Sequence, residues 1–89
     1  MTMAYKVEHE NEYEVLKKAV KTALQVYEAE ILPEAVFATE LGADSIDLAQ
    51  IYRLVEQELH IEIDPASIAE TKTVKDAYEI ICKAVAGNE

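Results

Sequence analysis

One short stretch in the middle of the chain, residues 40–48, holds the side chains best placed to do chemistry. Its serine, Ser45, has Asp44 immediately before it and Asp47 two residues after it, and Gly42 lies just upstream. An amphipathic pattern begins here, so we expect a helix that starts at or just after Asp44, a natural N-cap, with the charge of Asp47 in its first turn. Gly42 permits a backbone bend before that helix. Ser45 would then lie at the positive end of a helix dipole, a position that suits a serine carrying a phosphate-linked group.

Three roles are open to Ser45: catalytic nucleophile, plain helix cap or modification site. A nucleophile needs a neighbouring base and a group that orients this base. The histidines are His9, close to the start of the chain, and His60, at the far end of the expected helix, and the G-x-S-x-G pattern of hydrolases is absent. We therefore expect no catalytic residues and no enzyme activity. Without its surrounding motif, a plain cap would be the simplest interpretation.

The residues around the serine resemble the phosphopantetheine attachment motif of acyl carrier proteins, usually written L-G-x-D-S-L. Residues 41–47 read L-G-A-D-S-I-D, and an aromatic residue that recurs in the family is matched by Phe37, eight residues before the serine. The segment 61–65 and the Thr-Val pair at 73–74 are similar to the downstream pattern. The resemblance extends from about Phe37 to Ile81, with a looser fit over the first helix.

This resemblance implies a free-standing, non-catalytic carrier. A phosphopantetheinyl transferase would attach 4'-phosphopantetheine from coenzyme A to Ser45, with Asp44 and Gly42 completing the cofactor-binding site. Acyl intermediates would travel as thioesters on this arm between separate enzymes of fatty acid, polyketide or a related specialised acyl pathway. Two alternatives stay open: an aminoacyl or peptidyl carrier, and a structural or regulatory interaction module that keeps the fold and carries nothing.

The resemblance also implies a docking surface on the helix that follows the serine. Partner enzymes of the acyl-transferring, ketosynthase or ligase type would approach it with basic patches. Helical periodicity places Ile46 on the outer face, where it is either a docking contact or a singly exposed aliphatic side chain; the family, which keeps an apolar residue here, favours docking. Gln50 and Arg53 stand where many fatty-acid carriers have an acidic and an apolar residue, which favours a specialised pathway. The expected docking residues are Ile46, Asp47, Gln50, Arg53 and Glu56.

Members of the family shelter the acyl chain between their helices. The apolar residues expected to line such a pocket here are Phe37, Ile51, Val55, Leu59, Ile63, Ile68 and Ile81.

The elements that must position these residues form an all-α fold, a small bundle of four helices, three main and one short. Apolar residues at 3.6-residue spacing predict its helices, and the carrier domain is expected over residues 11–87 after a frayed lead-in at 1–10. A long loop, residues 28–43, joins the first two helices. The expected helices are one from Tyr13 to about Tyr27, one over Ser45–Leu59, a short one from Pro65 to about Ala69, and one from about Thr73 to Ala86.

Several residues carry more specific expectations. Tyr13 and Tyr27 would be core or boundary aromatics, Thr73 and Asp76 a capping pair for the last helix, and Cys82 a small buried hydrophobe. His60 would be a surface or capping residue. Five apolar residues would hold the long loop over the core: Ile31, Leu32, Val36, Phe37 and Leu41.

Composition narrows the functional class further. The 89 residues are 51% hydrophobic, as in a globular domain, and carry a net charge of −10 from eighteen acidic and eight basic side chains. This charge argues against nucleic acid or an anionic membrane as the main partner. The sequence contains no apolar run of membrane-spanning length, no signal-peptide pattern and no EF-hand loop, and one histidine with scattered carboxylates is no metal site. We expect a monomeric cytoplasmic protein without a metal.

Overall fold

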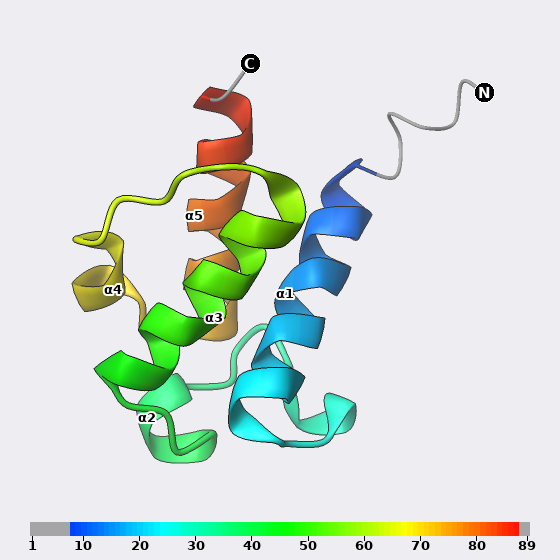
Figure 1. The fold of residues 1–89 in the computed structure, drawn as a ribbon. Coiled ribbons are helices and arrows are strands. Elements are labelled where there is room, and N and C mark those ends of the chain that lie inside the picture. Colours follow the sequence, from blue (N-terminus) through cyan, green and yellow to red (C-terminus); the bar gives the residue numbers. More distant parts are fainter. Residues whose placement is uncertain (1–7, 88–89) are drawn as a thin grey trace.

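The computed structural model describes residues 8–87, and over these the fold is all-α, as the sequence predicts. Three long helices form a bundle, and shorter elements lie on the connections between them (Figure 1). Within the described range there is no β-strand, and no helix is long and apolar enough to cross a bilayer. The long helices are α1 (Glu8–Leu24), α3 (Ser45–Leu59) and α5 (Val74–Gly87), and the short elements are η2 (Glu28–Glu30), α2 (Phe37–Glu40) and α4 (Ser67–Glu70).

The core lies where α1 packs against both α3 and α5. Each long helix contributes apolar side chains at helical spacing, so that one stripe per helix faces inward. Several of these side chains have no exposed surface at all, and they fix the positions of the three helices relative to one another. The fully buried set on the long helices is Leu16 and Val20 of α1, Ile51 and Val55 of α3, and Val74 and Ile81 of α5.

The first helix begins and ends earlier than predicted. It starts at Glu8, so the expected lead-in is helical at residues 8–10, and its remaining part, 1–7, lies outside the described residues. At its other end Gln25 takes a left-handed backbone conformation, with φ of 57°, and donates its N–H to the Lys21 carbonyl. The expectation that Tyr27 lies in the core or at its boundary is wrong, because the chain leaves the helical path before Tyr27, whose side chain is 79% exposed.

The long connection from α1 to α3 is more regular than the sequence predicts, since it contains η2 and α2. Backbone hydrogen bonds tie it to the start of α5: the N–H of Phe37 donates to the Lys72 carbonyl at 2.9 Å, and the N–H of Val74 donates to the Ala35 carbonyl at 3.0 Å. Ile31, Phe37 and Leu41 are buried and Val36 is half-buried, as expected. Leu32 is a correction: it opens a tight turn closed by Ala35 and is 49% exposed.

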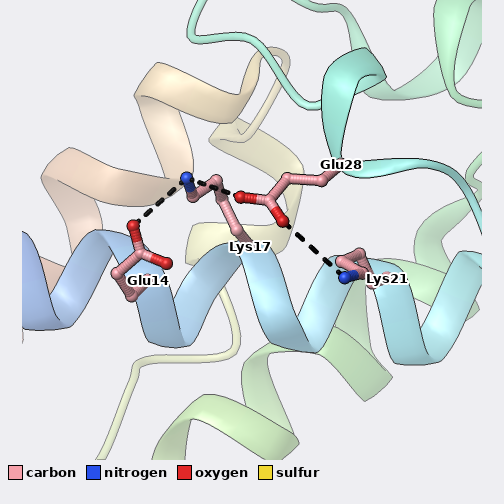
Figure 2. A network of polar contacts seen from close by, with 4 residues as sticks. All are labelled: Glu14, Lys17, Lys21 and Glu28. Carbon is pink, nitrogen blue, oxygen red and sulfur yellow. Dashed lines mark hydrogen bonds and ion pairs between the residues drawn. The ribbon is translucent and has the colours of Figure 1, made fainter.

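Ion pairs hold the beginning of this connection against α1. In Figure 2 the carboxylate of Glu28 lies between two lysines of α1, with 3.2 Å from Lys17 Nζ to Glu28 Oε2 and 3.7 Å from Lys21 Nζ to Glu28 Oε1. Lys17 also pairs with Glu14 at 3.2 Å and lies 5.0 Å from the centre of the Tyr13 ring. Hydrogen bonds to the two carboxylates raise the pKa of Lys17, and the bond to Lys17 lowers the pKa of Glu28. Both shifts favour the charged forms and therefore the pairing.

A side-chain cap fixes the start of α5, whereas α4 begins at Ser67, two residues after its predicted start, and has no side-chain cap. Asp64 Oδ1 accepts the Ala66 N–H at 2.9 Å in the turn that leads into α4. The predicted pair at the start of α5 is present, because Thr73 Oγ1 accepts the Asp76 N–H at 3.1 Å and Asp76 Oδ2 accepts the Thr73 N–H at 3.0 Å. Backbone hydrogen bonds, chiefly from Thr73, lower the pKa of Asp76 and keep its carboxylate charged. α5 runs through Gly87, one residue beyond its predicted end.

Candidate functional site

The site begins with the cap of α3, which forms as the sequence predicts. Asp44 has extended backbone angles, and its Oδ1 accepts the Asp47 N–H at 2.9 Å. In return, Asp47 Oδ2 accepts the Asp44 N–H at 3.2 Å, which completes a capping box. Ser45 is therefore the first residue of the helix, and its place in space is fixed by neighbours on both sides.

The loop before the cap is anchored by hydrogen bonds to Phe37 and bends at Gly42. The Phe37 carbonyl accepts the N–H groups of Leu41, at 3.2 Å, and of Ala43, at 2.9 Å, and both of these side chains are buried. Gly42, between them, has φ of +69°, a conformation that L side chains rarely adopt, although an added Cβ would meet no atom within 4 Å. Glycine is thus favoured here for its backbone freedom and not for space. Ser45, three residues after the bend, is exposed.

A groove of about 660 Å³ opens beside Ser45, between α2, the first turn of α3, and α4 with the segment that follows it. Its lining is mainly apolar and includes two of the predicted pocket residues, Phe37 and Ile68, together with Leu48 and Ala43. Thr71 and Lys72, which sequence reasoning missed, also line it. They reach the groove because backbone hydrogen bonds join their segment to α2, and no local pattern in the sequence carries that information.

The other predicted pocket residues lie elsewhere. Ile51, Val55 and Ile81 have no exposed surface and belong to the core, and Leu59 is half-buried near the far end of α3. Ile63 lines a separate cavity of about 180 Å³. An acyl pocket built from all seven residues therefore stays a prediction, and in this conformation only two of them border the groove next to Ser45.

Comparison with known proteins identifies the family of this chain. Residues 14–81 match the family model described as "Phosphopantetheine attachment site". The chain is also 38% identical over 68 residues to the acyl carrier protein of Nitratidesulfovibrio vulgaris, which covers 76% of this chain and 90% of that protein. It is 38% identical over 69 residues to the acyl carrier protein of Clostridium perfringens, covering 78% of this chain and 91% of the relative. The chain belongs to the acyl carrier protein family.

The prosthetic group of the acyl carrier family is 4'-phosphopantetheine, attached covalently. The residues of this site fit such a group. Ser45 is exposed at the N-terminus of the 15-residue helix α3, where the helix dipole favours the negative charge of a phosphodiester. Lys72 lines the same groove and adds positive charge. The groove itself supplies apolar surface beside the point of attachment.

The predicted docking residues of this carrier divide into two kinds. Ile46 is 75% exposed, and Gln50 and Arg53 are exposed as well. Asp47 and Glu56 are half-buried and already engaged, Asp47 in the capping box and Glu56 through Oε2, which accepts the Ile63 N–H at 2.7 Å. The first three side chains present their surface to solvent, whereas the two acids hold the carrier's own backbone.

The two other side chains considered in the sequence for chemistry, His60 and Cys82, lie at the C-terminal end of α3 and on α5. His60 is the C-cap of α3, as predicted, with a left-handed φ of 57°. Cys82 is half-buried rather than buried; its Sγ lies 3.3 Å from the buried carboxylate of Glu12, and burial raises the pKa of the thiol. Among residues 8–87 no three potential metal ligands come together.

The cap gives a first test of how this site is built. We expect Asp44→Ala to lower the free energy of unfolding by about 1 kcal/mol, because the Asp47 N–H loses its acceptor. Asp44→Asn is the matched control, since an asparagine oxygen also caps helices and should preserve most of the stability. Chemical denaturation followed by circular dichroism measures both. Equal stability of the alanine variant and the wild type would contradict a stabilising capping box.

Proposed function

We propose that this protein carries acyl intermediates as thioesters on a 4'-phosphopantetheine arm attached to Ser45. The observation that supports this assignment is the exposed serine at the first position of α3, held by the capping box and bordering an apolar groove. In the loading reaction, catalysed by a phosphopantetheinyl transferase, Ser45 Oγ gives up its proton and forms a bond to the phosphorus next to pantetheine, while the pyrophosphate P–O bond of coenzyme A breaks and adenosine 3',5'-bisphosphate leaves. The arm then supplies a thiol, and the chain itself performs no catalysis.

The carrier contributes position rather than chemistry. A tethered thioester is presented at a high effective concentration to each enzyme that the carrier meets. The net charge of −10 speeds encounter with basic surfaces more than it tightens binding, which suits a protein that must dissociate after each transfer. The same charge opposes self-association, so we propose a monomer. Between cargoes the thiol of the arm is free and must stay reduced, so we propose a cytoplasmic location, where thiols are kept reduced.

We further propose that partners dock on the exposed face of α3 next to the serine. Ile46 offers an apolar contact at 75% exposure, and Gln50 and Arg53 give this face a less acidic character than the chain as a whole. Such a face suits dedicated acyl-transferring, ketosynthase-type or ligase enzymes of a specialised acyl pathway better than the general enzymes of fatty acid synthesis.

The test of the carrier function is the intact mass of the purified protein. It is recorded before and after incubation with coenzyme A, magnesium and a broad-specificity phosphopantetheinyl transferase. A gain of one phosphopantetheine group supports the carrier function. No gain from a folded protein would favour an interaction module that carries nothing.

Docking makes a separate prediction. We expect Ile46→Ser to reduce kcat/KM of the transferase about tenfold, as for a central apolar contact of an interface, while the free energy of unfolding changes by less than about 0.5 kcal/mol. Leu32→Ser is the matched control, because Leu32 is another exposed aliphatic residue, at 49%, and lies outside α3. Equal kinetics for Ile46→Ser and the wild type with every partner tested would refute the docking face.

A further inference from the structure

A hydrogen-bonded pair of hydroxyl groups is buried close to the groove next to Ser45. Tyr52, on α3, is 4% exposed and Thr71, after α4, is 7% exposed, and their hydroxyl oxygens lie 2.5 Å apart. Thr71 donates its proton to the Ser67 carbonyl at 2.7 Å. A threonine hydroxyl has a single proton, so Tyr52 must be the donor to Thr71. The result is a directed chain from Tyr52 through Thr71 to Ser67.

The phenol keeps its proton under all ordinary conditions. Burial raises the pKa of Tyr52 to about 12, although the hydrogen bond with Thr71 opposes this shift. The hydroxyl therefore stays neutral and able to donate at physiological pH. A buried donor that loses its acceptor is costly, so the pair resists separation by an apolar group.

The pair lies between two cavities. Thr71 lines the groove of about 660 Å³ that borders Ser45, whereas Tyr52 lines the cavity of about 180 Å³ along α3. Pro65 and Ile68 line both spaces. The Tyr52–Thr71 bond thus connects a lining residue of one cavity to a lining residue of the other, and a chain of methylenes that follows this shared wall from the groove into the second cavity meets this polar link.

We propose that the Tyr52–Thr71 hydrogen bond limits the length of the saturated acyl chain that this carrier shelters. A short chain finds apolar surface on Phe37, Leu48 and Ile68 without disturbing the pair. A longer chain must separate the two hydroxyls and leave the Tyr52 donor facing methylene groups. The cargo class favoured by the groove is therefore the short acyl thioester. This inference rests on the proposed attachment at Ser45.

The experiment compares two cargoes on three proteins. Wild type, Tyr52→Phe and Tyr78→Phe are loaded with butanoyl or octanoyl phosphopantetheine, and the cleavage of each thioester by hydroxylamine is timed. Tyr52→Phe is a clean change, because Thr71 retains its bond to Ser67 and no donor is left unpaired. Tyr78→Phe is the matched control, because it also removes one phenol hydroxyl. Tyr78 lies on α5, and its ring packs against the ring of Tyr13 on α1.

In the wild type and in Tyr78→Phe, octanoyl and butanoyl thioesters should be cleaved at similar rates, because the additional methylenes of octanoyl gain no shelter while the Tyr52–Thr71 bond is intact. In Tyr52→Phe, octanoyl cleavage alone should slow about fivefold, the factor that corresponds to the ~1 kcal/mol of one hydrogen bond. Strong protection of octanoyl in the wild type, or equal rates in Tyr52→Phe, would overturn the length limit and leave the carrier function intact. Failure of all three folded proteins to accept either group would instead overturn the carrier function, and the length limit with it.

Discussion

Ser45→Ala will abolish the gain of phosphopantetheine completely, the largest effect that we expect of any single substitution. Alanine has no oxygen to form the bond to phosphorus, so the loss is a change from full loading to none. The fold should persist, because Ser45 is exposed and the capping box is made by Asp44 and Asp47. We expect the free energy of unfolding to change by less than about 0.5 kcal/mol. Intact mass and far-ultraviolet circular dichroism measure loading and folding on the same samples.

The chain offers a natural control for this experiment. Ser67 is the only other serine, and its backbone carbonyl accepts a hydrogen bond from the Thr71 hydroxyl, a bond that does not need the serine side chain. Ser67→Ala should therefore load as fully as the wild type. Mass gain in Ser45→Ala would place the attachment at another residue. Loss of helical signal in that variant would show instead that Ser45 is needed for the fold.

The start of α3 could be predicted to the residue because its causes are local. A capping box depends on two side chains three positions apart, and Asp44 and Asp47 are both visible in the sequence. The exposure of Ile46 followed equally well from helical periodicity. The same holds for the cap of α5, which is formed by Thr73 and Asp76.

The sequence-based predictions were wrong where long-range contacts, or a turn without a glycine or proline, determine the structure. Nothing in the sequence signals that α1 stops at Leu24, since the left-handed residue after it is Gln25 and not a glycine. The exposure of Tyr27 follows from that turn. Periodicity also shows only that a residue faces inward, and it does not separate a packed core residue such as Ile51 from a groove residue such as Ile68.

The groove is the clearest case of information that the sequence does not carry. Two of its polar residues, Thr71 and Lys72, come beside Phe37 through the hydrogen bond from the Phe37 N–H to the Lys72 carbonyl. Two connecting segments thus meet at one wall of the groove, α2 and the residues after α4. The long helices supply the rigid core, and the connections shape the surface next to the serine.

Phe37→Ala should cause the largest loss of stability, because Phe37 links this wall to the core. Its side chain is 1% exposed, and its backbone bonds to Lys72, Leu41 and Ala43 anchor the loop that positions the cap of α3. Removing a buried aromatic ring costs about 3–5 kcal/mol. For a domain of this size, this corresponds to a fall in Tm of roughly 12 °C or more. Differential scanning calorimetry measures the change.

Tyr27→Ala provides the comparison, since it removes an aromatic ring of similar size that is 79% exposed. We expect it to change the free energy of unfolding by less than about 0.5 kcal/mol, because no buried contact is lost. Phe37→Leu should lie between the two, since leucine refills part of the space. If Phe37→Ala were as stable as Tyr27→Ala, the connection that contains α2 would not be packed into the core. The position of Ser45 would then depend on its capping box alone.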